Sequence, residues 1–289
     1  MTGRPTLPAT AVAALSCPVC AAPLAAGEGE ALLRCPAGHS FDRARQGHVS
    51  LLPPGHRPPS GDSAAMVADR SAFLAAGHYA GVSAALADAA LGEEDAAAPS
   101  TLLDLGGGTG QHLAAVLDRA PAAAGIVLDS SPYAARRAAR AHPRAMAVVA
   151  DTWARLPVRD AAVDRVLVVF APRNGPETAR VLRPGGRLVV VTPAPDHLAE
   201  IVGPLGLLRV DPGKAQRLSD SLEPHLVPVD VRAHRQVLSL DHAAVATLVG
   251  MGPHARHLTT AGLAASLGRL PSPVEVTISV DIGRYRRAR

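Results

Sequence analysis

The sequence predicts an α/β protein with an open, mostly parallel β-sheet, preceded by a small metal-binding module. From Thr101 onward, short apolar runs alternate with helical stretches rich in Ala and Arg, which is the order of elements in a doubly wound sheet. All three cysteines lie between residues 17 and 35, close to a histidine, which indicates a metal site. We therefore divide the chain into a metal-binding domain at 1–50, a linker and helical segment at 51–100, and the sheet domain at 101–289.

Composition is typical of a globular protein. Hydrophobic residues make up 48% of the 289 residues and aromatic residues only 2%, so Ala, Val and Leu must fill the core. The longest apolar runs, at 166–170 and 188–191, are far shorter than a membrane span, so we expect no membrane partner. Residues 9–16 are apolar but too short for a signal peptide, and we expect a loose N-terminus there and a cytoplasmic protein.

The positive charge is clustered. The formal net charge is +4. Basic residues gather in two segments, namely Arg136, Arg137, Arg140, His142 and Arg144, and Arg284, Arg286, Arg287 and Arg289. Such clusters suit a polyanionic partner, although a solvated helix face and a loose tail would have the same composition.

The first element of the chain is a candidate zinc centre. Cys17 and Cys20 form a Cys-x2-Cys pair, and Cys35 and His39 form a Cys-x3-His pair after a gap of 14 residues. Two close pairs of thiolate and imidazole donors are what a tetrahedral zinc site needs. A disulfide would leave one cysteine over in a chain without a convincing export signal. Because four protein ligands leave no open position, we predict one structural Zn²⁺ per chain.

A linker and a helix are expected between the two domains. Residues 48–63 are rich in Pro, Gly and Ser and are interpreted as a linker. From Ser63 to about Leu91, the spacing of the apolar residues predicts a single helical stretch.

A glycine-rich turn follows the first strand of the sheet domain. Residues 101–105 are an apolar run around Asp104, and the glycines of the turn that follows are Gly106, Gly107, Gly108 and Gly110. Glycine allows the backbone to approach a ligand where a side chain would block it. By itself, this turn is compatible with dinucleotide, flavin and S-adenosylmethionine binding.

Further apolar runs supply the rest of the sheet. The runs at 124–129 and 146–151 end in Asp129, which is placed to bind ribose hydroxyls, and in Asp151, which Thr152 follows. Residues 163–170 and 181–191 predict a fourth and a fifth strand, and residues 274–281 predict a half-buried antiparallel edge strand.

Three strand-end acids beside one glycine turn, together with LRPGG at 182–186, resemble the class I S-adenosylmethionine-dependent methyltransferases. This resemblance implies a Rossmann-like, seven-stranded, mostly parallel sheet. It also implies that Asp104 lies near the methionine moiety of S-adenosylmethionine, that Asp129 binds the ribose and that Asp151 holds the adenine amino group.

The chain as a whole is similar to a narrower family. The Cys/His cluster, FDRARQGHVSLL, GDSAAMVADRSAFLAAGHY, FAPRN and TPAPDHL together resemble the bacterial 23S rRNA (guanine-N1)-methyltransferases. GGGTG, GLLRV and MGP are most similar to the branch from antibiotic-producing actinobacteria, where the modification protects the ribosome from macrolides of the tylosin or mycinamicin kind. The resemblance implies methylation of N1 of a guanine in a hairpin loop of 23S rRNA domain II, an RNA and not a DNA partner, and a homodimer.

The family's cofactor contacts fall on Tyr79, Gly108, Thr109 and His197, and its zinc ligands fall on the four residues named above. With the wider superfamily, the expected cofactor-binding residues are Tyr79, Asp104, Gly106, Gly108, Thr109, Gly110, Asp129, Asp151, Thr152 and His197. Thr109 stands where housekeeping members usually carry an acid, so the contacts of this loop differ from theirs.

Two other segments concern the substrate. The motif at 170–174 lacks the pattern of enzymes that methylate exocyclic amines, which favours a ring nitrogen, and Arg173 and Asn174 are candidates for orienting a base. The sequence identifies no general base. Candidate phosphate contacts on the metal-binding module are Arg34, Arg43 and Arg45, which would make residues 1–50 an RNA-recognition domain.

Two alternatives remain open from the sequence. The protein could be a small-molecule methyltransferase of an antibiotic pathway, or a non-catalytic RNA-binding protein with a vestigial cofactor site. Trp153 could stack on adenine or on a substrate base, or it could pack in the core.

Overall fold

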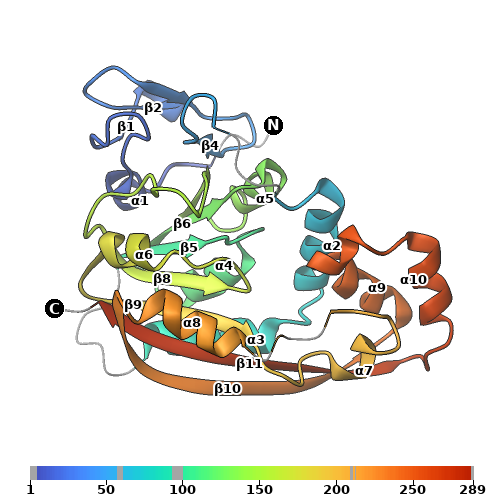
Figure 1. The fold of residues 1–289 in the computed structure, drawn as a ribbon. Helices are drawn as coiled ribbons and strands as arrows, with labels where there is room; N and C mark the ends of the chain where they lie inside the picture. The colour runs from blue at the N-terminus through green and yellow to red at the C-terminus, as the bar shows by residue number, and fades with distance from the viewer. Residues whose placement is uncertain (1–4, 57–60, 93–99, 209–210, 212, 288–289) are drawn as a thin grey trace.

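The computed structural model describes residues 5–56, 61–92, 100–208, 211 and 213–287. Figure 1 shows a small N-terminal sheet above a large sheet domain, with a group of helices at one side of that domain. Within the described residues, no helix is both long and apolar enough to cross a membrane.

The large sheet has eight strands within the described residues, in the order β10-β11-β9-β8-β5-β6-β7-β4. Neighbouring strands from β9 to β4 are parallel, whereas β11 is antiparallel to both β9 and β10. The strands are β4 (Val49–Ser50), β5 (Thr101–Leu105), β6 (Ala124–Asp129), β7 (Ala145–Val149), β8 (Val163–Val169), β9 (Leu182–Pro193), β10 (Leu226–Leu240) and β11 (Val274–Arg287). Seven of them form the sheet that the methyltransferase resemblance implies, and β4 is an additional strand.

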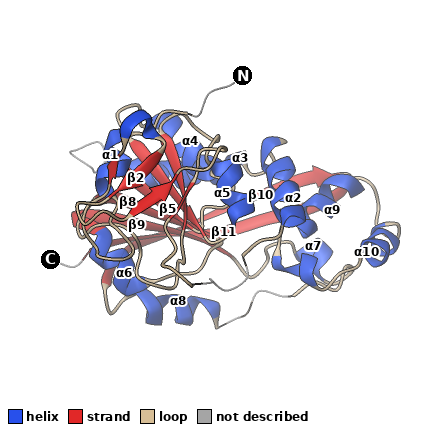
Figure 2. Cartoon of the chain, turned by 90° about the horizontal axis from the view of Figure 1, so that it is seen from above, coloured by secondary structure: helices blue, strands red, loops and turns tan. Residues whose placement is uncertain are grey.

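Helices cover both faces of this sheet (Figure 2). Successive side chains of a strand point to opposite faces, so Val127 of β6 belongs to one apolar cluster and Ile126 and Leu128 belong to the other. The helices are α1 (Ala9–Ala14), α2 (Ala64–Ala75), α3 (Ala80–Leu91), α4 (Gln111–Arg119), α5 (Pro132–Ala138), α6 (Gly175–Val181), α7 (Ala199–Val202), α8 (Lys214–Leu222), α9 (His242–Gly250) and α10 (Thr260–Leu267). Helices α3, α4, α5 and α9 pack in the first cluster, and α1, α6 and α8 pack in the second.

The N-terminal module has no core of its own. Its antiparallel strands are β1 (Ala25–Ala26), β2 (Leu32–Arg34) and β3 (Ser40–Asp42), and a short 3-10 helix, η1 (Glu28–Glu30), precedes β2. Leu33 of this sheet is buried in the same apolar cluster as Leu103 and Ile126 of the large sheet. The module is therefore stabilised by packing on the sheet domain as well as by its metal ligands.

Residues 9–16 are not the loose N-terminus that we expected, because residues 9–14 form helix α1 and Leu15 and Ser16 form β-bridges to Val158 and Pro23. The helix buries Ala11, Val12 and Ala14 against the large sheet. The segment is too short to be stable alone, and only the tertiary contact makes it helical.

The predicted linker at 48–63 is wrong for its first residues, because they form β4. Val49 and Ser50 pair with β7, and the amide of Leu51 donates to the carbonyl oxygen of Val149 at 2.9 Å. Val49 and Leu51 are buried. The domain boundary predicted after residue 50 therefore falls directly behind a strand of the large sheet.

The single helical stretch predicted from Ser63 to Leu91 is two helices, α2 and α3. Ser63 begins the first by accepting a hydrogen bond from the amide of Met66 at 3.3 Å. Gly77, with a φ of 81°, lies in the turn that separates them. This turn places Tyr79 with its ring centroid 5.2 Å from that of Phe73. Apolar periodicity did not reveal the turn because both helices bury apolar residues.

β11 is an inner strand and not the predicted edge strand. It is antiparallel, as expected, but it lies between β9 and β10, and β10 forms the edge of the sheet. The alternation of a strand reports which of its faces is buried, and it carries no information on a neighbour that joins through backbone hydrogen bonds.

Several clustered arginines hold the fold together, so their predicted contact with a polyanion is wrong. Arg144 donates three hydrogen bonds to carbonyl oxygens in and just after the last turn of α4. Arg284, 5% exposed, pairs through two nitrogens with Asp230. Arg43 is 4% exposed, and its Nη1 lies 3.6 Å from Oε2 of Glu30. It is therefore not the phosphate contact that we expected.

We predict that the module and the sheet domain unfold together. Leu33→Ala removes a fully buried side chain and should lower the free energy of unfolding by about 2–4 kcal/mol. Urea titrations followed by far-UV circular dichroism and by the fluorescence of Trp153, the one tryptophan, should shift in parallel. Val229→Ala, at a side chain 43% exposed on β10, is the control and should change little. A Leu33→Ala variant whose Trp153 transition stays at the wild-type urea concentration would contradict this prediction.

Candidate cofactor site and zinc centre

The four predicted metal ligands lie together in the N-terminal module. Donor atoms of Cys17, Cys20, Cys35 and His39 all fall within 4.8 Å of one another. Nδ1 of His39 lies 3.4 Å from Sγ of Cys35 and 3.6 Å from Sγ of Cys17, and the sulfurs of Cys20 and Cys35 are 3.7 Å apart. With bonds of about 2.3 Å to sulfur and about 2.0 Å to nitrogen, a tetrahedral Zn²⁺ site has edges of about 3.5–3.8 Å. The donor set therefore fits a structural Zn²⁺ that His39 would bind through Nδ1.

The glycine turn after β5 lies in close contact with neighbouring strand ends. A Cβ atom at Gly107 would lie 2.5 Å from Oδ2 of Asp104, and one at Gly106 would lie 2.6 Å from Cβ of Ala171, in the loop after β8. Glycine is therefore required here by the packing of the protein itself, besides any ligand that the turn holds. Gly110 is the residue directly before α4.

Asp104 is a fully buried carboxyl group. It is 0% exposed, and neither of its oxygens has a hydrogen-bond partner among the described residues. Burial raises its pKa to about 7, and the nearby charge of Asp129 acts in the same direction. Because a buried polar group without a partner is costly, Asp104 is suited to a ligand that brings a positive charge or a hydrogen-bond donor.

Asp129, at the end of β6, is tied to the glycine turn. Its Oδ2 accepts from the amide of Gly108 at 2.9 Å, and its Oδ1 accepts from the amide of Ser131 at 2.8 Å. Burial raises the pKa of Asp129, and these two hydrogen bonds lower it. A carboxylate oxygen has more than one lone pair, so Asp129 could also accept from ligand hydroxyls.

Asp151 lies two residues after β7 and joins two loops. Its Oδ1 accepts from the amide of Trp153 at 2.8 Å, and its Oδ2 lies 2.8 Å from Nε2 of His56. His56 belongs to the segment that we interpreted as a linker, so its contact with Asp151 was not expected. The pair connects the chain behind the zinc-binding module to the edge of the cofactor site.

Tyr79 and His197 lie beside Phe170, which directly follows β8. The ring centroid of Phe170 is 6.0 Å from that of Tyr79 and 5.9 Å from that of His197. Phe170 has a φ of 53°, a left-handed conformation that is strained for this residue type. Nδ1 of His197 lies 3.0 Å from the carbonyl oxygen of Ser279 on β11, which fixes the imidazole.

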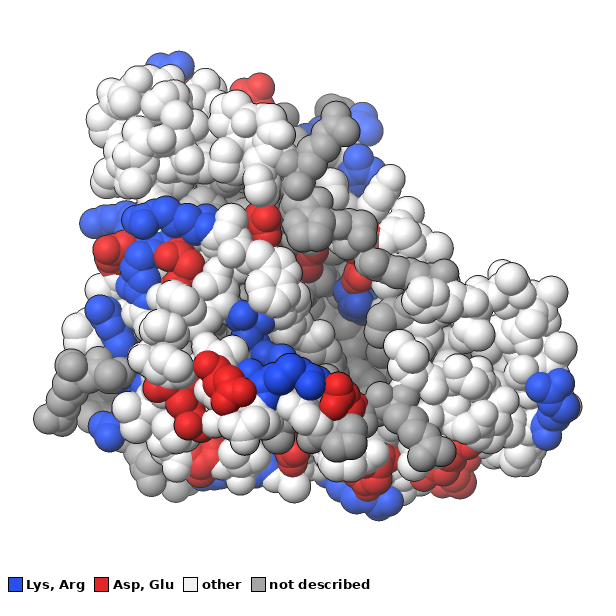
Figure 3. Space-filling model, viewed as in Figure 1, with Lys and Arg blue, Asp and Glu red and all other residues white. Residues whose placement is uncertain are grey.

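These elements surround one cavity of about 660 Å³, visible as a hollow in the face shown in Figure 3. The predicted cofactor residues that line it are Tyr79, Asp104, Gly106, Gly108, Thr109, Asp129, Asp151, Thr152 and His197. Gly110 does not line the cavity. Its place is structural, at the start of α4.

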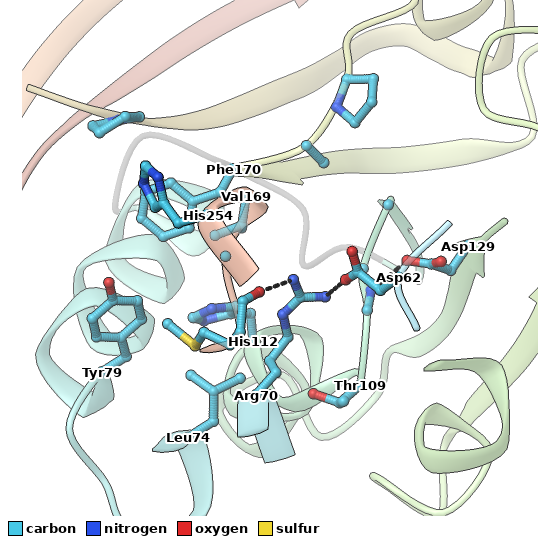
Figure 4. A pocket seen from close by; sticks show the side chains of 18 of the residues that line it. Asp62, Arg70, Leu74, Tyr79, Thr109, His112, Asp129, Val169, Phe170 and His254 are labelled. Atoms are coloured by element: carbon cyan, nitrogen blue, oxygen red, sulfur yellow. Dashed lines mark hydrogen bonds and ion pairs between the residues drawn. The ribbon is translucent and has the colours of Figure 1, made fainter. Parts of the chain in front are cut away.

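Sequence reasoning missed an ion pair across this cavity. Arg70 of α2 pairs with Asp62 and donates to the carbonyl oxygen of Met251 at 2.9 Å, and Figure 4 shows it between Tyr79 and Asp129. It thereby ties α2 to the end of α9. A charged residue within an apolar helix was the available signal, but its partners lie in other segments.

The loops after β7 and β8 form the other wall. Trp153 is 60% exposed and lines the cavity, so its packing in the core is excluded. Arg173 is half-buried and also lines the cavity. Asn174 does not, because its amide nitrogen donates to the carbonyls of Thr152 and Ala154 at 3.1 Å each.

The cavity fits S-adenosylmethionine. The cationic methionine end of this molecule suits the unpaired carboxyl of Asp104, its ribose hydroxyls suit Asp129, and its adenine amino group suits Asp151. Bound there, it would supply a methyl group that the positively charged sulfur makes electrophilic. The protein's part is to bind and orient the reacting groups and to exclude water.

Comparisons with known proteins agree with this architecture. Residues 15–58 match the N-terminal zinc ribbon of RlmA, and residues 102–186 match a methyltransferase domain. A provisionally named methyltransferase from Bacillus halodurans has a similar fold, with a TM-score of 0.50 at 16% identity over 72% of this chain and 99% of its own. Fold, cavity and zinc centre thus define a class I S-adenosylmethionine-dependent methyltransferase with an N-terminal zinc ribbon.

Two relatives identify the family. A Micromonospora griseorubida protein, provisionally named a 23S rRNA (guanine-N1)-methyltransferase, is 54% identical over 94% of this chain and 97% of its own. The 23S rRNA (guanine(748)-N1)-methyltransferase of Streptomyces fradiae is 51% identical over 92% of this chain and 94% of its own. The chain belongs to the 23S rRNA (guanine-N1)-methyltransferase family, which confirms the family predicted from the motifs.

We predict that Asp104 costs stability. Because its folded pKa is raised, the folded state holds a proton that the unfolded state releases, so stability should fall as the pH rises from about 4 to about 7. Asp104→Asn should therefore be as stable as the wild type near pH 4 and more stable by on the order of 3 kcal/mol at pH 7. Urea denaturation at several pH values measures this difference.

The same variant should lose affinity for S-adenosylhomocysteine in calorimetry, since the carboxylate is removed. Equal stability of the wild type and Asp104→Asn at pH 7 would show that folding does not disfavour the ionised carboxyl group of Asp104.

Proposed function

We propose that this protein transfers a methyl group from S-adenosylmethionine to N1 of one guanine in a hairpin loop of domain II of 23S rRNA. We further propose that the modification protects the ribosome from macrolides of the tylosin or mycinamicin kind. The observation that carries this proposal is the identity of 51% across both domains with an enzyme named for guanine 748 of 23S rRNA. The cofactor-binding role of the nine expected residues that line the cavity is part of the proposal.

A basic surface shared by both domains supports an RNA partner. The loop at 44–48 behind the zinc ribbon packs on α5, where a Cβ at Gly47 would lie 3.3 Å from Cβ of Ala139. Exposed basic residues on the two elements are Arg45, Arg136, Arg137 and Arg140, and we call them the basic surface. Exposed Tyr133 lies beneath Arg136, whose guanidinium carbon is 5.7 Å from the ring centroid. Clustered guanidinium groups with an aromatic ring suit RNA backbone and unstacked bases.

Helix α5, which carries part of the basic surface, begins beside the cofactor cavity. Ser131 caps α5 with its hydroxyl, and its own amide donates to Asp129. The start of α5 therefore contacts Asp129, the residue proposed to bind the ribose. The last turn of the same helix carries Arg136 and Arg137. We propose that RNA bound to residues 1–50 and α5 presents one flipped base to the cavity. Exposed Arg34 would extend this contact on the zinc ribbon.

Two further statements remain proposals. A homodimer is implied by the family resemblance, and sedimentation equilibrium would measure it. A ribosomal RNA substrate places the protein in the cytoplasm, which fractionation of the producing cell would test.

The proposed reaction is tested by primer extension on 23S rRNA incubated with the protein and S-adenosylmethionine. N1-methylguanine cannot form a Watson–Crick pair, so reverse transcriptase should stop at one guanine of the domain II hairpin. Cys35→Ser should lose this stop, because the zinc ribbon would no longer hold its shape. Methyl transfer to a macrolide precursor, with no stop on the RNA, would identify a small-molecule enzyme. No transfer to either substrate would leave a non-catalytic RNA-binding protein.

We predict that neutralising the basic surface weakens RNA binding without changing the fold. The triple variant Arg136→Gln, Arg137→Gln and Arg140→Gln should lower the affinity for the RNA hairpin by about tenfold or more at low salt. The slope of the logarithm of affinity against the logarithm of salt should fall by about one for each lost contact. Arg269→Gln, at an exposed residue just after α10, is the matched control. An unchanged salt slope in the triple variant would exclude this surface as the RNA site.

A further inference from the structure

The cavity has a wall that the cofactor residues do not account for. This wall lies in the loops that follow β7 and β8 and is formed by Trp153, Phe170 and Arg173. Both loops leave the same edge of the sheet as the glycine turn, so the wall faces the place where the proposed methyl donor would be bound.

Arg173 is the charged group of this wall. Among the described residues, no side chain or carbonyl forms a hydrogen bond or an ion pair with its guanidinium group. Partial burial and the neighbouring charge of Arg217 on α8 lower the pKa of Arg173, and Tyr285 on β11 acts in the opposite direction. Arg217 differs from it, because it is paired with Asp211 at 2.9 Å. As far as the described residues go, the donors of Arg173 are therefore available to a ligand with acceptor atoms.

Asn174, the residue after Arg173, holds the backbone on both sides of Trp153. The two carbonyls that accept from the Asn174 amide, those of Thr152 and Ala154, flank Trp153 in the chain. Asn174 also caps α6 by accepting from the amide of Glu177 at 3.3 Å. Both amide hydrogens of Asn174 are thus used within the protein. Asn174 is therefore a positioning residue for the backbone that carries the exposed indole ring of Trp153.

The chemistry of guanine decides which of its edges this wall can read. Transfer to N1 requires that the Watson–Crick edge point toward the methyl donor. The acceptors of the adjoining Hoogsteen edge, O6 and N7, are then available to the protein, and a guanidinium group can bind both of them at once. The flat ring needs a stacking surface, which an exposed indole offers.

Resting on the proposed function, we propose that Arg173 recognises the flipped guanine through O6 and N7, with Trp153 as its stacking surface. Specificity for guanine then comes from Arg173, because adenine carries an amino group in place of O6. The exocyclic amino group at C2 makes no essential contact.

The test compares methyl transfer to synthetic hairpins that differ only in the target nucleoside. With the wild-type protein, 7-deazaguanosine, which lacks the N7 acceptor, should lower kcat/KM by about tenfold or more relative to guanosine. Inosine, which keeps O6 and N7 but lacks the amino group, should stay within about threefold of guanosine. A wild-type protein that does not distinguish guanosine from 7-deazaguanosine, or that rejects inosine, would overturn the proposal.

Variants assign this discrimination to one side chain. Arg173→Met should lower kcat/KM on guanosine and bring the ratio of guanosine to 7-deazaguanosine close to one, while Arg173→Lys keeps the charge and should give an intermediate ratio. Arg217→Met is the matched control and should keep the wild-type ratio. Loss of the ratio in Arg217→Met and its survival in Arg173→Met would show that Arg217 is the reading residue, against the proposal.

Calorimetry with S-adenosylhomocysteine checks the integrity of each variant, because Arg173 does not belong to the proposed cofactor ligands. Arg173→Met should bind this compound with the wild-type Kd; if it does not, Arg173→Lys carries the comparison. Absence of any methylation of the guanosine hairpin by the wild-type protein would overturn the proposed function itself, and this inference with it.

The stacking surface has its own readout. Trp153→Ala should weaken hairpin binding by roughly 5-fold to 100-fold, the range measured for single stacked bases. Trp153→Phe should restore most of that affinity, since it keeps an aromatic face. Equal binding by the Ala and Phe variants would exclude stacking at Trp153.

Discussion

The parallel pairing of β8, β5, β6 and β7 is the constraint on which the rest of the structure depends. Parallel strands finish at the same edge of a sheet, so Asp104, Asp129 and Asp151 converge although each comes from a different segment. The loop after β8 leaves the same edge and brings Phe170 and Arg173 to the cavity. A single geometric rule thus places the proposed cofactor residues and the proposed base-reading residues around one space.

The site is built at a cost to the fold. Asp104 is buried without a hydrogen-bond partner among the residues that the structure describes, and Phe170 has a left-handed backbone conformation. Both features lie at the end of a sheet whose two faces are covered by apolar clusters, and such packing can hold costly local conformations in place. Energetically costly features of this kind, beside a well-packed sheet, are typical of ligand-binding sites.

The zinc ribbon is attached to the catalytic domain more closely than a tethered module would be. It shares an apolar cluster with the sheet, adds β4 to the sheet edge, and continues to His56, which contacts Asp151. The metal centre is therefore linked to the proposed adenine end of the cofactor site through a short run of ordered chain. The loop at 44–48 also packs against the end of α5, and the residue before α5, Ser131, contacts Asp129.

The sequence by itself determined the features that depend on neighbouring residues. Ligand spacing defined the zinc centre, and glycines with strand-end acids defined the cofactor turn, because turn geometry and side-chain alternation are set locally. Most cofactor residues expected in this way line the cavity, and Gly110 stands at a helix start instead.

Only the tertiary structure decided what depends on partners far along the chain. Strand β4 and the inner position of β11 follow from strand pairing, and the helical conformation of α1 follows from its packing on the sheet. No local sequence pattern predicts these contacts. The same holds for charged groups: Arg43 is buried beside Glu30, whereas Arg173 has no partner among the described residues. A sequence shows that an arginine is present, but its role is set by whether an acceptor from elsewhere in the fold reaches it.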